Sequence, residues 1–257
     1  MSRIKKAFEN GKAFIPFLTG GDPDIATTEK LIHVMEENGA DLIEIGVPFS
    51  DPIAEGVVIQ AADERALKGG VTTDDLFAMV KRVRQTSQIP LVFMTYYNPV
   101  FSYGNEKFLA NCQDCGIDGI IIPDLPFEES DEIRGTCQKY GIDLINMIAP
   151  TSEERIEKIA KSAEGFLYCV SSLGVTGVRE HITTNVGAMI EKVKKVSDIP
   201  CCIGFGISDT EQARSMAAVS DGVIVGSAIV RMVAADGADS VDKVAAYVKD
   251  MKTAANS

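Results

Sequence analysis

The chain has 257 residues, of which 46% are hydrophobic and 24% charged, fractions that are ordinary for a globular protein. Its 37 acidic and 25 basic residues give a net charge of −12. This charge argues against nucleic acid or an anionic membrane as a partner, because both repel an acidic surface. An anionic small ligand remains compatible with it, since backbone amides can bind such a group.

No targeting or membrane segment is expected. The N-terminal residues 1–10 lack the apolar core of a secretory signal, and no stretch approaches the length of a membrane span. Six cysteines without a disulfide-scaffold context predict a reduced, cytoplasmic setting. Cys112 and Cys115 form a lone C-x-x-C, and without a second pair or a nearby histidine we favour a structural role over a redox or metal role.

Apolar strand-like segments alternate with amphipathic helical segments along the chain. We predict eight strands near residues 13–18, 41–46, 91–95, 118–122, 143–148, 166–170, 200–203 and 222–226. Helices are predicted near residues 27–38, 74–86, 105–115, 128–140, 153–162, 186–196 and 209–217, with a further short helix at the N-terminus. Strands that each lead into a helix indicate a parallel sheet.

The number of strands decides between two parallel α/β architectures. An open doubly wound sheet would have G-x-G-x-x-G after its first strand, but Gly20-Gly21-Asp22-Pro23 follows it here. Eight β/α units in 257 residues match an eight-stranded barrel, which typically has about 250 residues. We therefore predict a single (β/α)8 TIM barrel domain over residues 1–257.

Glu44 is the residue that best indicates chemistry. It interrupts an almost wholly apolar strand at residues 40–47, where an unpaired carboxylate costs several kcal/mol. A second acid, Glu55, follows in a loop rich in proline and glycine. A costly carboxylate at a strand end with another acid on the next loop suggests acid–base chemistry.

The sequence lacks the residues that three other roles of this region would need, namely a structural ion pair, a Schiff base and a metal site. No predicted strand contains the arginine that a structural ion pair with Glu44 would use, and none has a lysine near its carboxyl end for a Schiff base. A metal site lacks ligands, because His33 lies within a predicted helix and His181 in a late loop. Carboxylate acid–base catalysis remains, with burial raising the pKa of Glu44 towards neutrality.

Glycine-rich loops follow the last three predicted strands. Residues 204–208 and 225–228 follow strands seven and eight, the usual phosphate site of such barrels, although a plain strand-to-helix turn has similar composition. Neither motif contains lysine or arginine, so backbone amides would bind the anion. The loop at 171–179 fits either a lid that closes over substrate or a merely mobile connection.

Six motifs together resemble the tryptophan synthase α-subunit family, in that family's order, from about residue 14 to 230. They are Phe17-Leu-Thr-Gly-Gly-Asp-Pro23, Glu44-Ile-Gly-Val-Pro-Phe-Ser-Asp-Pro52, Ile121-Ile-Pro-Asp-Leu-Pro126, Gly174-Val-Thr-Gly177, Gly204-Phe-Gly206 and Val225-Gly-Ser-Ala228. The resemblance implies a lyase that cleaves indole-3-glycerol phosphate to indole and glyceraldehyde 3-phosphate by a retro-aldol step.

The resemblance also assigns site residues. Glu44 matches the catalytic glutamate, Glu55 the second catalytic acid and Tyr168 a tyrosine beside them. The implied substrate-binding residues are Phe17, Tyr96, Ile121, Asp124, Thr176 and Phe205, and the implied phosphate-binding residues are Gly177, Gly206, Gly226 and Ser227. The family's second acid is usually aspartate. The extra methylene of Glu55 moves its carboxylate by about 1 Å, and a misplacement of this size can cost about 10²-fold in rate.

A partner is implied as well. The family assembles with a tryptophan synthase β subunit, which carries pyridoxal phosphate, as an α2β2 heterotetramer, so no cofactor or metal is expected in this chain. Asp51 is the residue expected to meet the partner. It lies in a predicted loop at 48–60 whose apolar side chains suit either a lid or a docking surface.

Three alternatives stay open. A related barrel such as indole-3-glycerol phosphate synthase would need strand-end lysines, which are missing. A self-sufficient indole-3-glycerol phosphate lyase would differ only in its independence from a partner. A regulatory subunit that binds substrate without efficient turnover is the third, because Glu55 departs from the family pattern.

Overall fold

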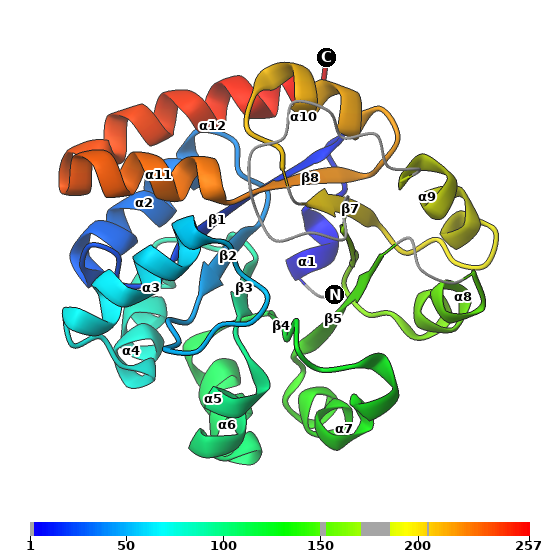
Figure 1. The fold of residues 1–257 in the computed structure, drawn as a ribbon, viewed down its shortest axis with the longest axis horizontal. Coiled ribbons are helices and arrows are strands. Elements are labelled where there is room, and N and C mark those ends of the chain that lie inside the picture. The colour runs from blue at the N-terminus through cyan, green and yellow to red at the C-terminus, as the bar shows by residue number, and fades with distance from the viewer. Residues whose placement is uncertain (1–2, 150–152, 171–185, 205) are drawn as a thin grey trace.

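The computed structural model describes residues 3–149, 153–170, 186–204 and 206–257, and their eight strands close into a parallel barrel in chain order (Figure 1). The strands are β1 (Ala13–Thr19), β2 (Ile43–Gly46), β3 (Leu91–Met94), β4 (Gly119–Ile121), β5 (Asp143–Ile148), β6 (Leu167–Val170), β7 (Cys201–Gly204) and β8 (Gly222–Val225). β8 pairs with β1, which closes the sheet. The predicted barrel is confirmed, and every predicted strand is found.

Helices surround the barrel on its outside (Figure 1). The α-helices are α1 (Arg3–Lys6), α2 (Ile25–Glu37), α3 (Val57–Lys68), α4 (Thr73–Val83), α5 (Tyr97–Tyr103), α6 (Asn105–Cys115), α7 (Asp131–Tyr140), α8 (Glu153–Ser162), α9 (Val186–Lys194), α10 (Thr210–Ala217), α11 (Ser227–Asp236) and α12 (Val241–Ala255). Two 3-10 turns, η1 (Phe127–Glu129) and η2 (Gly237–Ser240), precede α7 and α12.

The predicted loop at 48–60 is too long, because α3 already begins at Val57. Gly56 is its N-cap, and the Gln60 side chain in the first turn donates a hydrogen bond of 2.8 Å to the Glu55 carbonyl oxygen. This bond satisfies a carbonyl just before the helix and ties the loop to the helix start. The apolar residues that begin α3 therefore belong to a helix with one buried face, on which Ile59 lies, and not to a free loop.

Side-chain alternation along the strands separates two apolar layers. Odd-numbered residues of β1, such as Ile15, point into the barrel, and so does Leu42, the residue before β2. Ile43 and Ile45 of β2 pack towards the helices instead. Glu44 has the same parity as Leu42 and therefore points inward. A closed barrel of this size has room inside only for packed side chains, so an inward glutamate is removed from bulk water.

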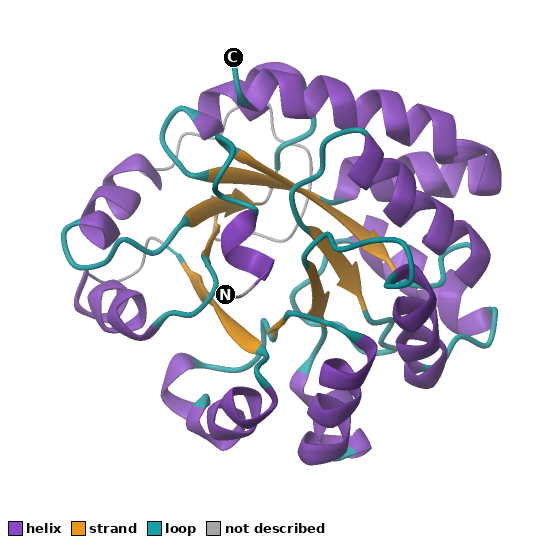
Figure 2. Ribbon diagram, turned by 180° about the vertical axis from the view of Figure 1, so that it is seen from behind, coloured by secondary structure: helices purple, strands orange, loops and turns teal. Residues whose placement is uncertain are grey.

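The short helix α1 lies across the opening at the amino ends of the strands (Figure 2). Ile4 packs with the barrel interior. Arg3 Nε donates to Asp118 Oδ1 over 2.6 Å, and Arg84 donates to Asp118 Oδ2 over 2.9 Å. The predicted N-terminal helix is thus present, and it closes one end of the barrel, so that access to the interior is from the carboxyl ends of the strands.

The cysteines fit the structural role favoured above. All six are free and buried. Burial raises the pKa of the Cys115 thiol to about 11, which leaves it unreactive near neutrality. In the described ranges no group of three histidine, cysteine or acidic residues could hold a metal ion, and no helix there is long and apolar enough to cross a membrane.

Candidate active site

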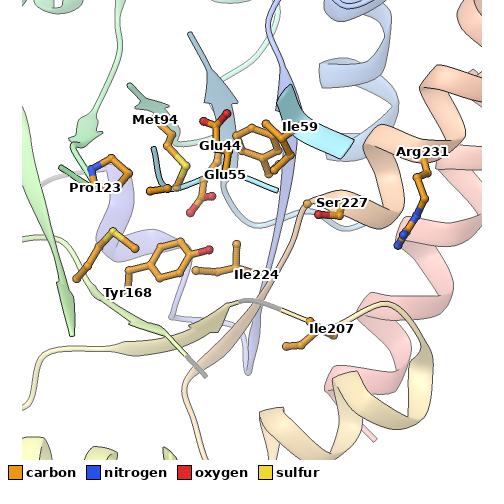
Figure 3. A pocket seen from close by; sticks show the side chains of 15 residues that line it. Glu44, Glu55, Ile59, Met94, Pro123, Tyr168, Ile207, Ile224, Ser227 and Arg231 are labelled. Atoms are coloured by element: carbon orange, nitrogen blue, oxygen red, sulfur yellow. The ribbon is translucent and has the colours of Figure 1, made fainter. Parts of the chain in front are cut away.

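A cavity opens at the carboxyl ends of the strands, bringing together residues from several strands and the loops that follow them (Figure 3). Its polar lining comprises Glu44, Glu55, Tyr168, Ser227 and Arg231, with Gly206 and Gly226. Its apolar lining includes Phe17, Ile59, Met94, Met147, Ile207 and Ile224. An apolar hollow with a few converging polar groups is typical of a site for a small, partly aromatic ligand.

Glu44 lies at the base of this cavity between the two neighbouring strands. Its backbone pairs with Phe17 of β1 and Val92 of β3. Its side chain is 0% exposed, and neither carboxylate oxygen has a hydrogen-bond partner in the described part of the chain. Burial raises the pKa of Glu44 to about 8. The carboxyl group is therefore mostly protonated near neutrality and can both give and accept a proton there.

Tyr168 occupies an inward position on β6 and lines the same cavity (Figure 3). Burial raises its pKa well above the usual value, and the nearby Glu44 charge contributes in the same direction. Its ring lies against Gly204 on β7, where a Cβ atom would collide with the tyrosine hydroxyl. The strand therefore needs glycine at 204 for the ring to reach this position.

Glu55 reaches the cavity from the loop between β2 and α3. The loop is held by Tyr96, the N-cap of α5, whose hydroxyl accepts a hydrogen bond of 3.0 Å from the Ala54 amide. Tyr96 also packs on Phe49, with ring centroids 5.4 Å apart. Burial raises the pKa of Glu55, while hydrogen bonds from Asp63 and Tyr96 oppose that rise. Glu44 and Glu55 are thus two carboxyl groups in one cavity with different surroundings.

The other end of the cavity is formed by the start of α11. Gly226 is the N-cap and Ser227 the first residue of that helix, so amide groups there lack helical partners and favour an anion. Gly206, whose φ of 86° favours glycine, lies beside them in the lining.

Arg231 also lines this end, although the sequence analysis missed it by considering only the loop motifs. It lies one helical turn after Ser227, beyond it as seen from the two glutamates (Figure 3). Residues at i and i+4 share a helix face, and this spacing from Ser227 is the signal that could have found it. This end of the cavity therefore includes a basic side chain that neither loop motif contains.

The remaining predicted substrate residues lie in different places. Tyr96 is behind Glu55, and Ile121 is fully buried in the barrel core beneath the cavity. Asp124 lines a separate hollow and accepts a hydrogen bond of 2.9 Å from the Tyr97 amide. Thr176, Gly177 and Phe205, with the predicted lid at 171–179 and His181, fall outside the described residues.

The outer face of the β2–α3 segment is apolar and exposed. Ile53 is 75% and Val57 78% exposed, and Asp51 is exposed on the same loop. Ile59, in contrast, packs with Phe17 under the cavity. The segment therefore carries Glu55 towards the cavity and presents apolar side chains to the outside.

Comparison with known proteins identifies the family to which the chain belongs. The family profile described as "Tryptophan synthase alpha chain" matches residues 3–256. The chain belongs to this family. A relative from Lacticaseibacillus casei named tryptophan synthase alpha chain is 47% identical over 254 residues, covering 99% of this chain and 96% of the relative.

Solved structures agree with the family assignment. Tryptophan synthase subunit alpha from Legionella pneumophila superposes with a TM-score of 0.90 at 37% identity, covering 99% of this chain and 98% of the other. A chain of the tryptophan synthase a2b2 complex from Pyrococcus furiosus superposes with a TM-score of 0.86 at 36% identity, covering 94% and 98%. The chain is a lyase of tryptophan biosynthesis, and its reaction cleaves indole-3-glycerol phosphate to indole and glyceraldehyde 3-phosphate.

Burial of Glu44 makes stability depend on pH. Its pKa is about 8 in the folded protein against 4.5 for a free glutamate side chain, so only the folded state keeps the proton between these values. The stability contributed by the protonated form is present at low pH and is lost as pH rises towards 8. We expect Glu44→Gln to gain stability relative to the wild type as pH rises, by up to about 1.4 kcal/mol per pH unit.

Urea unfolding at about pH 5.5 and about pH 8.5 measures this difference, with the exposed Glu64→Gln as the control. A wild-type-minus-mutant difference that is equal at both pH values would contradict the assignment of the proton to Glu44.

Proposed function

We propose that Glu44 and Glu55 together catalyse the retro-aldol cleavage of indole-3-glycerol phosphate in this chain. The observation that carries the proposal is the buried, unpartnered Glu44 carboxyl group facing the same cavity as Glu55. Phe17, Met94 and the other apolar side chains of the lining suit the indole ring, and the α11 end of the cavity suits the phosphate.

Glu44 acts first as the acid. Its protonated carboxyl group donates a proton to the indole carbon that bears the glycerol phosphate side chain, leaving positive charge on the ring nitrogen. The resulting Glu44 carboxylate then takes the proton of the adjacent side-chain hydroxyl. The hydroxyl-bearing carbon becomes a carbonyl carbon, and the bond between this carbon and the indole ring breaks. The electron pair of that bond returns to the ring. Indole and glyceraldehyde 3-phosphate are released, and Glu44 is protonated again.

Glu55 acts through its negative charge. A carboxylate next to the ring nitrogen stabilises the positive charge that develops when the ring is protonated, and such stabilisation is strongest in a water-poor cavity. Tyr168 contacts the same reacting region from β6, next to Glu44. Acid and charge stabiliser are thus two different carboxyl groups, one neutral and one ionised.

Arg231 and the start of α11 bind the phosphate. The amides near Gly226 and Ser227 donate hydrogen bonds along the helix axis, and the Arg231 guanidinium adds a full positive charge one turn further on. Gly206 adds to this end of the cavity, and Gly177, which the family resemblance also assigns to the phosphate, lies outside the described residues. An acidic protein can bind an anionic substrate in this way because the local charge at the helix start is positive.

The partner is a tryptophan synthase β subunit in an α2β2 assembly, the form in which the Pyrococcus furiosus complex was solved. Its docking surface includes Asp51 and the exposed Ile53 and Val57, whose apolar area suits a protein interface. The reaction uses no cofactor in this chain, and pyridoxal phosphate belongs to the β subunit. The six free thiols agree with a cytoplasmic location.

Removal of the acid tests the proposed chemistry. Glu44→Gln keeps the shape of the side chain but cannot transfer the proton, so indole release should fall by about 10²-fold or more. Glu55→Gln, which removes only the charge, should lower kcat by about 10²-fold. The control is Glu64→Gln on the outer face of α3. Wild-type turnover in Glu44→Gln would overturn the mechanism.

Arg231→Gln tests the phosphate site. Loss of one charge-assisted contact should raise KM for indole-3-glycerol phosphate about tenfold, equivalent to about 1.4 kcal/mol, with a smaller effect on kcat. Arg82→Gln, on the distant helix α4, is the matched control for loss of one surface arginine. Equal KM values in the wild type and Arg231→Gln would remove Arg231 from the phosphate site.

Partner dependence is measured by adding a matching β subunit. The isolated chain should release indole slowly and the β subunit should accelerate it, because docking on the β2–α3 segment orders the loop that carries Glu55. Ile53→Glu should keep the slow basal rate and lose the acceleration, since a charge replaces apolar contact area. If the β subunit leaves the wild-type rate unchanged, the coupling fails and the chain is a self-sufficient lyase.

A further inference from the structure

A third carboxyl group, that of Asp63, interacts with Glu55 of the proposed catalytic pair. Asp63 is on α3, two turns after Glu55, and only 3% of it is exposed. Buried aspartates are rare unless they are paired with a cation, a metal or hydrogen-bond donors. The proposed catalytic mechanism does not use Asp63 and so does not account for its burial.

The surroundings of Asp63 contain acids and a single amide donor. Its side chain is hydrogen-bonded to that of Glu55 and to the backbone amide of Phe49, and the charge of Asp22 is also close. Arg65, two residues along α3, does not neutralise it, because Arg65 forms a two-point pair with Asp22 at 2.8 and 2.7 Å. Of the groups that most affect Asp63, none comes from α11, the helix packed against α3.

Two carboxyl groups that share a hydrogen bond cannot both be ionised, since a carboxylate has no proton to donate. Burial, followed by the Glu55 charge and the shared hydrogen bond, raises the pKa of Asp63 to about 9. The same hydrogen bond favours the charged form of Glu55, against the burial that raises the pKa of Glu55 overall. Asp63 is the more deeply buried of the two carboxyl groups, so the proton of the pair resides on Asp63.

The Glu55 carboxylate also needs a donor. Its Oε2 atom is buried, and no permanently protonated group of the described chain donates to it. Tyr96, the N-cap of α5, donates to the Glu55 side chain, and its hydroxyl also accepts the hydrogen bond from the Ala54 amide. A neutral Asp63 is the neighbour that can supply the missing proton.

We propose that Asp63 is a positioning residue which, as a neutral carboxylic acid, donates a hydrogen bond to the Glu55 carboxylate and fixes its place and its negative charge. This inference rests on the proposed role of Glu55 in catalysis and deepens it. A glutamate has one more rotatable bond than the aspartate usual in the family, and a donor on the helix behind it removes that freedom. The departure at position 55 is thus matched by an acid at position 63.

The pH profile of kcat/KM separates this role from a merely structural one, because its acid limb reports the ionisation of Glu55 in the free enzyme. Asp63→Leu removes the donor, so the Glu55 carboxylate is less stable and the acid limb should move up by roughly one pH unit. Asp63→Asn keeps a donor for Glu55 and an acceptor for the Phe49 amide, so its acid limb should stay near that of the wild type. Glu64→Leu is the control on the exposed face of the same helix.

An activity-independent readout is the infrared band of a protonated carboxyl group. In a Glu44→Gln background, which removes the other neutral acid, the band should be present at pH 7 and absent after Asp63→Asn. Adding Glu55→Gln should lower the pH at which the band disappears, because the charge and hydrogen bond that hold the proton on Asp63 are gone. This readout applies even if Asp63→Leu fails to fold.

The outcomes distinguish this inference from the proposed function. An unshifted acid limb in Asp63→Leu, or a band that is unchanged by Asp63→Asn, would overturn the positioning role even if Glu55→Gln is inactive. Full turnover in Glu55→Gln would instead show that Glu55 is not catalytic. If the infrared band were still lost on Asp63→Asn, the proton shared by Asp63 and Glu55 would nevertheless be confirmed.

Discussion

The unpaired burial of the Glu44 carboxyl group is the constraint on which the site depends. Packed side chains fill the interior of the closed barrel, and parity along β2 turns Glu44 inward beside Leu42 and the other core side chains. No arginine or hydrogen-bond donor of the described residues meets it, and burial raises the pKa of Glu44 to about 8. An acid that would be ionised on the surface is therefore available as a proton donor near neutrality.

The second carboxyl group, Glu55, has a different environment. Glu55 is on a loop at the rim, where Tyr96 and Asp63 stabilise the charged form against partial burial. The proposed catalytic pair thus combines a fully buried acid inside the barrel with a second acid whose charged form is supported by hydrogen bonds. Both depend on the same segment, since β2 carries one residue and the loop after it the other.

The fold separates stability from chemistry along the barrel axis. At the amino ends of the strands, α1 and the Arg3–Asp118–Arg84 cluster close the interior with packed side chains and ion pairs. At the carboxyl ends, β2, the loop after it and α3 bring together three carboxyl groups whose burial is costly for stability, those of Glu44, Glu55 and Asp63. The unfavourable burial of these carboxyl groups at one end is tolerated because the other end and the two apolar layers are densely packed.

Local patterns in the sequence determined the eight strands, the barrel, the unusual position of Glu44 and the motifs of the family, because alternation and turn residues act over short distances. Asp63 could not be found in this way, and the only local signal for Arg231 was its i+4 spacing from Ser227. Each is a charged residue on an amphipathic helix, where such residues usually form the solvated face. Only closure of the barrel and the packing of α3 and α11 bring Asp63 to Glu55 and Arg231 to the cavity. Proximity between distant segments is a property of the tertiary structure, and that proximity sets which acid keeps its proton.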